Sequence, residues 1–116
     1  MKTLLLPHFI KQLKPLLKKY SDLRESLEKE LGNFSKESSQ YVGKRVYKLR
    51  LANKKLGRGK SGGFRLYVLF VEQNELLVPL AIYAKSNKKN LPEPELQYHL
   101  EMTLLELSNK NRHFVD

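Results

Sequence analysis

Apolar residues in the first third of the chain recur at the spacing of an α-helix. Two stripes have this spacing: Ile10, Leu13, Leu17 and Tyr20, and then Leu23, Leu27 and Leu31. Pro15 interrupts the first stripe, and because an interior proline costs about 3 kcal/mol in a helix, we expect a kink or break near Lys14. Asp22 can cap the second helix and Gly32 can end it. The pattern predicts a helical hairpin over residues 7–31.

After a polar loop over residues 33–40, the hydrophobic period changes from that of a helix to that of a strand. Residues 46–51 alternate strictly, so that one face of the predicted strand is apolar and the other carries cations. Residues 64–71 predict a second, more buried strand. Residues 76–84 predict a third, in which Pro79 indicates an edge or a bulge because it lacks a ladder donor. The short turns between the strands imply an antiparallel meander.

The C-terminal part of the chain predicts a final helix and a polar tail. Pro92 and Pro94, together with nearby glutamates, suit its first turn. Its expected apolar stripe is Leu96, Leu100, Leu104 and Leu107. With a short first strand at residues 2–6, the predicted order is β-α-α-β-β-β-α, an α+β domain with its helices on a mainly antiparallel sheet. We expect one domain over residues 1–108 and a polar tail over residues 109–116.

Composition adds a strong positive charge to this fold. The chain has 116 residues, a formal net charge of +10 and a pI near 9.8. Such a balance favours nucleic acid, an anionic membrane surface or an acidic protein as partner. The chain contains no cysteine, which excludes disulfides and thiolate metal sites. No signal peptide is recognised, and no run approaches the ~20 apolar residues of a membrane span, so we expect a cytoplasmic protein.

The positive charge is densest in a stretch of 17 residues that contains no acid. Its eight cations are Lys44, Arg45, Lys48, Arg50, Lys54, Lys55, Arg58 and Lys60. These cations repel one another, and phosphate is the leading candidate for the anion that offsets the repulsion. Lys48 and Arg50 on one strand and Arg65 at the start of the next can project toward the same side of the sheet. The glycines of residues 57–63 allow another backbone to approach closely.

Two other kinds of site are poorly supported by the sequence. Residues 59–61 read Gly-Lys-Ser, but Lys54 stands where a P-loop needs its first glycine, and a strand follows in place of a helix. His8, His99 and His113 share no metal-ligand spacing, and we expect His8 and His99 at surface positions of helices. We therefore predict no metal and no cofactor.

Three segments resemble toxins of the RelE/ParE superfamily, in its HigB/RelE-like branch. Residues 46–51, Val-Tyr-Lys-Leu-Arg-Leu, resemble the second strand of these proteins. Residues 59–65, Gly-Lys-Ser-Gly-Gly-Phe-Arg, resemble the branch signature G-K-S/R-G-G-Y/F-R. Residues 83–91, Tyr-Ala-Lys-Ser-Asn-Lys-Lys-Asn-Leu, resemble its segment Y-x-K-N-E-x-x-x-L. The resemblance extends over about residues 3–107.

The resemblance implies a microbial RNase fold and a ribosome-dependent endonuclease that cuts mRNA in the ribosomal A site. Such a toxin belongs to a type II toxin–antitoxin system and is silenced by its cognate antitoxin. The catalytic residues carried over are Lys48, Arg50, Arg65 and Lys85. The expected RNA contacts are Lys54, Lys55, Arg58, Lys60 and Tyr83.

The resemblance leaves the acid and the base of the reaction open. Leu91 stands where some members carry tyrosine, and Tyr98, His99 and His113 are the remaining alternatives. Two other functions also stay open: a ParE-like protein that poisons DNA gyrase by protein contact, and a basic RNA-binding module without catalysis. The cationic strand face argues against the first of these, because a protein contact needs no phosphate-binding face.

Overall fold

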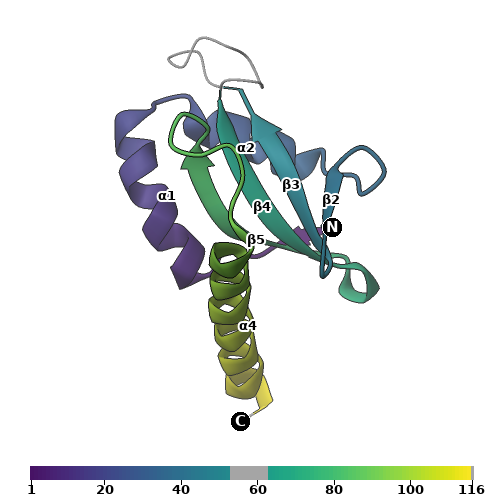
Figure 1. Ribbon diagram of the computed structural model, residues 1–116. Helices are drawn as coiled ribbons and strands as arrows, with labels where there is room; N and C mark the ends of the chain where they lie inside the picture. Colours follow the sequence, from purple (N-terminus) through teal and green to yellow (C-terminus); the bar gives the residue numbers. More distant parts are fainter. Residues whose placement is uncertain (53–62, 116) are drawn as a thin grey trace.

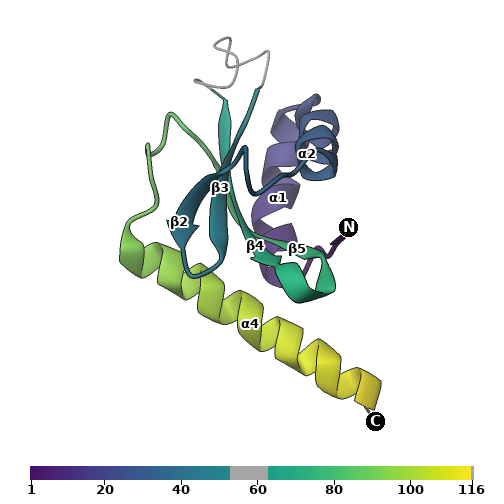
Figure 2. The same cartoon turned by 90° about the vertical axis from the view of Figure 1, so that its right-hand side faces the viewer.

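The computed structural model describes residues 1–52 and 63–115, with side chains through Asn109. It contains a five-stranded sheet covered by α1 and α2 on one face and by the first part of α4 on the other (Figures 1 and 2). In chain order the elements are β1 (Lys2–Thr3), α1 (Pro7–Lys19), α2 (Leu23–Gly32), β2 (Gln40–Gly43), β3 (Val46–Leu51), β4 (Phe64–Val71), the 3₁₀ turn η2 (Glu72–Asn74), β5 (Leu76–Ala84) and α4 (Glu93–Val115). None of the described helices has an apolar stretch long enough to cross a membrane.

The sheet has the strand order β1-β5-β4-β3-β2. Among the described strands, β1 and β5 pair in parallel, whereas the pairs β5–β4, β4–β3 and β3–β2 are antiparallel. The predicted α+β class with a mainly antiparallel sheet is therefore confirmed. Pro79 lies at a register shift between β4 and β5, which agrees with the predicted bulge. The strand β2 was not predicted, because this short edge strand includes the exposed Tyr41 and has no apolar alternation.

The helix α1 is continuous through Pro15, so the predicted break near Lys14 is wrong. Pro15 lies on the exposed side of the helix, as does Lys11, whose carbonyl would have accepted the missing hydrogen bond. That carbonyl can be hydrated, while Phe9 and Leu13 remain buried against the sheet. Packing of the apolar face thus outweighs the local cost of proline.

The helix α4 differs from the prediction in two ways. It includes residues 109–115, which were predicted as a polar tail, and its second half extends away from the sheet (Figure 2). Leu104 is 46% exposed and Thr103 is 1% exposed, so the predicted stripe is wrong at Leu104. At 3.6 residues per turn, Thr103 shares a face with Leu96 and Leu100, whereas Leu104 is turned away from it. The Thr103 hydroxyl donates to the His99 carbonyl at 2.7 Å, which satisfies this buried polar group.

Gly63 lies where the end of β3 approaches the start of β4 very closely. A Cβ atom at this position would lie 1.7 Å from the carbonyl oxygen of Leu51. The Gly63 carbonyl also accepts a hydrogen bond of 3.0 Å from the Lys85 N–H. The end of β3, the start of β4 and the end of β5 therefore meet at Gly63. The absence of a side chain at Gly63 leaves room for the backbone of β3.

Candidate functional site

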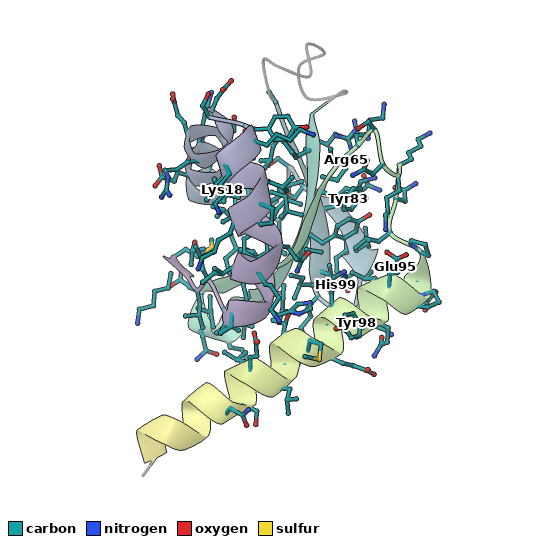
Figure 3. All side chains as sticks on the ribbon, turned by 90° about the vertical axis from the view of Figure 1, so that its left-hand side faces the viewer. Lys18, Arg65, Tyr83, Glu95, Tyr98 and His99 are labelled. Carbon is teal, nitrogen blue, oxygen red and sulfur yellow. The ribbon has the colours of Figure 1, made fainter. Side chains whose placement is uncertain are left out.

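The strand register brings the predicted cations together on one face of the sheet. Arg65 lies opposite Arg50 of β3 and opposite Tyr83 of β5, and Lys48 lies opposite Tyr67. Because side chains two residues apart share a face, these five side chains project from the same side of three adjacent strands. That side is opposite the one on which α1 and α2 pack. Figure 3 shows Arg65 and Tyr83 next to each other above α4.

We call Lys48, Arg50 and Arg65 the cationic cluster. Arg65 is 3% exposed and Lys48 is 6% exposed, whereas Arg50 is open to solvent. Burial, followed by the nearby charges of Arg65, Arg50 and Lys89, lowers the pKa of Lys48. Burial and the charge of Arg50 lower the pKa of Arg65. Like charges directly opposite each other destabilise a sheet, so an anion bound here would relieve a repulsion that the fold maintains.

Two tyrosines lie beside the cluster. The rings of Tyr67 and Tyr83 are stacked, with centroids 6.2 Å apart and an angle of 24° between their planes. Burial, and then the neighbouring Tyr67, raise the pKa of Tyr83, so its phenol stays protonated and able to donate. Tyr67 was not among the predicted site residues. Its position two residues after Arg65 on the same strand is the signal that could have identified it.

The segment after β5 passes over the cluster. Lys48 Nζ donates to the side-chain oxygen of Asn90 and, at 3.4 Å, to the carbonyl of Lys89. The Leu91 N–H donates to the Tyr67 hydroxyl at 3.1 Å. Lys88 pairs with Glu95 at 2.6 Å and lies 5.7 Å from the centre of the Tyr83 ring. The cluster is thus bordered by this segment as well as by the sheet.

The other predicted site residues are placed less directly. Lys85 lies at the same end of the sheet through its backbone bond to Gly63, but its side chain forms no hydrogen bond with the cluster among the residues that the structure describes. The predicted RNA contacts Lys54, Lys55, Arg58 and Lys60 lie outside the described residues. They belong to the segment that joins the strands of Arg50 and Arg65. The side chain of His113 also lies outside the described part.

His8 and His99 were predicted at surface positions of helices, and the structure shows both on helices, half-buried and in contact with each other. His8 Nε2 and His99 Nδ1 lie 2.8 Å apart, which joins the start of α1 to α4. The backbone N–H of His8 donates to the Glu106 carboxylate at 3.0 Å, and the Tyr98 ring meets His8 edge-on. A single hydrogen bond between two imidazoles requires that at least one of them be neutral. The contact between α1 and α4 therefore depends on the protonation of the two rings.

We expect the protein to lose stability as the pH falls from 7 to 5.5. Burial is the main cause that lowers the pKa of both His8 and His99, and the His8 ring lowers that of His99 further. The unfolded chain takes up these protons near pH 6.5, whereas the folded chain takes them up at lower pH. The stabilisation is complete above about pH 6.5 and is lost as the pH falls toward the lowered values. Urea unfolding midpoints across this range measure the effect.

The matched control for this pH dependence replaces both imidazoles with groups that do not titrate. The double variant His8→Gln, His99→Gln should lose much of the decrease between pH 7 and pH 5.5. An equal decrease in the variant and the wild type would assign the titration to other groups.

The cluster is a candidate site for an anion. Among the described residues, no group of three or more histidine, aspartate or glutamate side chains could hold a metal ion. Fixed cations, two phenols and a bordering loop can hold a phosphate and stabilise negative charge that develops on it. No protein-family model matches the chain, and no curated protein matches its sequence. The assignment of a function therefore depends on this geometry and on the resemblance of the three segments.

Proposed function

We propose that the chain is the toxin of a type II toxin–antitoxin system and acts as a ribosome-dependent, metal-independent mRNA endonuclease. The observation that carries this proposal is the row Arg50, Arg65 and Tyr83 across three adjacent strands, with Lys48 beside it on the same face. Phosphate groups of RNA are the ligands that such a row suits best, because its cations are held in place by the sheet.

A RelE-like fold of the microbial RNase type is part of the same proposal. An N-terminal helical hairpin, a mainly antiparallel sheet and a C-terminal helix support it. The resemblance to the glycine signature is supported by Gly63, because the contact with Leu51 gives that position a physical need for glycine. These features fit the resemblance in the parts of the chain that contain its motifs.

The reaction that fits the cluster is an attack of a ribose 2′-hydroxyl on the adjacent phosphorus. The new bond joins the 2′-oxygen to phosphorus, and the bond from phosphorus to the 5′-oxygen breaks. Lys48 accepts the proton of the 2′-hydroxyl, because its lowered pKa makes a neutral amine more accessible. Arg65 and Arg50 stabilise the charge on the phosphorane oxygens. Lys85 or Tyr83 donates a proton to the leaving 5′-oxygen, so the products are a 2′,3′-cyclic phosphate and a 5′-hydroxyl.

The proposed partners follow from this reaction. The ribosome presents the message, which places the activity in the cytoplasm, and a cognate antitoxin keeps the protein silent. An acidic antitoxin segment over the cationic cluster would both relieve the repulsion there and exclude RNA.

Induced expression of the chain without an antitoxin should arrest bacterial growth and break mRNA within its coding sequences. Message integrity, plasmid supercoiling and growth are measured together after induction. The variant Lys48→Ala should restore growth, whereas Lys14→Ala, which removes an exposed lysine of α1, should remain toxic.

The alternatives give different outcomes in the same experiment. Altered supercoiling with intact message would support the gyrase-poison function. Arrest with intact message and normal supercoiling would support a non-catalytic RNA-binding module. Unaffected growth would contradict the proposed toxin.

A further inference from the structure

The segment of residues 89–91 binds two buried groups of the sheet. Lys48 Nζ donates to the Asn90 side chain and to the Lys89 carbonyl, and the Tyr67 hydroxyl accepts the Leu91 N–H. Asn90 and Lys48 are 42 positions apart in sequence, so the tertiary fold alone brings them together. None of the three functions considered above assigns a role to Asn90.

We propose that Asn90 is a positioning residue that orients the Lys48 amine for proton transfer. This inference depends on the proposed endonuclease function, because it gives Lys48 a partner in that reaction. Asn90 acts through the lysine and does not itself need to touch the scissile phosphate.

The number of hydrogen bonds that the Lys48 amine can donate supports this role of Asn90. A neutral lysine amine has two N–H groups and one lone pair, and the charged form has three N–H groups. The segment supplies two acceptors, the Asn90 side-chain oxygen and the Lys89 carbonyl. When both acceptors are occupied by N–H groups, the remaining position on the nitrogen carries the lone pair or the transferred proton. Two fixed acceptors therefore set the direction in which this proton can move.

The two acceptors of the Lys48 amine are uncharged, which also suits a positioning role for Asn90. Both are neutral dipoles, so they hold the amine without the strong stabilisation of the ammonium form that a carboxylate would give. The surrounding charges of Arg65, Arg50 and Lys89 oppose the ammonium form as well. An asparagine at position 90 thus fixes the geometry of the base while leaving its lowered pKa in place. An aspartate at position 90 would instead form an ion pair with the ammonium form of Lys48.

The chain is attached to the rest of the fold on both sides of Asn90, which restricts the movement of this residue. Before it, Lys88 pairs with Glu95 of α4 at 2.6 Å. After it, Leu91 bonds to Tyr67 and packs with the core that α4 covers. Supports on either side hold the amide in place, which a positioning residue requires.

The test uses three variants of the full chain: Asn90→Asp, Asn90→Ala and, as the matched control, Asn87→Asp. Asn87, like Asn90, lies between β5 and α4, and it is exposed. The control therefore adds the same charge nearby without contacting Lys48. Ribosome-dependent cleavage of a defined message is measured as a function of pH, with kcat and KM separated. The pKa of the Lys48 amine is measured independently by NMR of ¹³C-labelled lysine, which requires no activity.

We expect Asn90→Asp to raise the Lys48 pKa and to shift the rising limb of the pH–rate profile upward by about one unit. We expect Asn90→Ala to lower kcat by up to about 10²-fold with little change in KM, because a small misplacement of the base has that effect. Asn87→Asp should leave the pH profile unchanged.

Two outcomes would overturn the inference, and they are distinguishable. If the wild type cleaves and both Asn90 variants keep its kcat and pH profile, the proposed function stands and the positioning role is wrong. If the wild type does not cleave, the proposed function is wrong and the role in proton transfer is lost with it. In that case the NMR measurement still shows whether Asn90 controls the Lys48 pKa.

Discussion

Replacement of Arg65 with alanine should lower the rate of the proposed mRNA cleavage by a factor of about 10² to 10³, which corresponds to the loss of one preorganised charge in the transition state. Arg65 is the central residue of the row across the sheet, with Arg50 on one side and Tyr83 on the other. No other described cation lies between these two neighbours. The fold should survive, because removal of one of two opposed arginines relieves a repulsion. Cleavage by equal amounts of folded wild type and variant measures the effect.

Two further variants separate the role of Arg65 from the general effect of positive charge. Arg65→Lys should also be impaired, since an ammonium group cannot reproduce the forked contacts of a guanidinium. Arg24→Ala, which removes an exposed arginine of α2, should cleave at nearly the wild-type rate. Near-normal cleavage by Arg65→Ala, together with an unchanged melting temperature, would remove Arg65 from the site.

Of the substitutions proposed for this protein, Gly63→Ala should lower the free energy of unfolding most, by about 3 kcal/mol. This value is at the upper end of the usual cost of overpacking a well-packed site. The added Cβ would lie 1.7 Å from the Leu51 carbonyl oxygen. A backbone atom cannot rotate away as the end of a side chain can, so the end of β3 has to move. That movement would separate Arg50 from Arg65 and reduce cleavage as well. Urea unfolding at pH 7.5 measures the loss.

Gly32 supplies the matched control, because a Cβ built there meets nothing within 4 Å. As a helical residue with open space around it, Gly32→Ala should be neutral or stabilise the protein by about 0.4 to 1 kcal/mol. Equal unfolding midpoints for the two alanine variants would show that the contact with Leu51 does not constrain the fold.

The sequence was sufficient to predict the cationic face, and the reason lies in the period of the strands. Alternation placed Lys48 and Arg50 on one side of β3, and the short chain between β4 and β5 favoured an antiparallel pair. The register of that pair, which places Tyr83 beside Arg65, comes from the structure. The same alternation applies to Tyr67, which was overlooked. Local patterns of this kind are readable because they depend on neighbours along the chain or across a tight turn.

Contacts between distant segments could not be predicted in this way. The bond between Lys48 and Asn90 spans 42 positions, and that between His8 and His99 spans 91. Each depends on how α4 and the segment before it pack on the sheet, which no local period encodes. At Pro15 a local pattern was readable but misleading. Its unfavourable helix preference predicted a break, whereas tertiary packing keeps α1 continuous.

End-group analysis of the products shows whether the cationic cluster cleaves ribosome-bound mRNA through the 2′-hydroxyl, as we propose. Purified protein is incubated with ribosomes that carry a defined message, and the ends of the fragments are identified by sequence and by chemistry. We expect cuts in the A-site codon, only when ribosomes are present, with a 2′,3′-cyclic phosphate upstream and a 5′-hydroxyl downstream. An intact message, or fragments that carry a 5′-phosphate, would contradict this expectation.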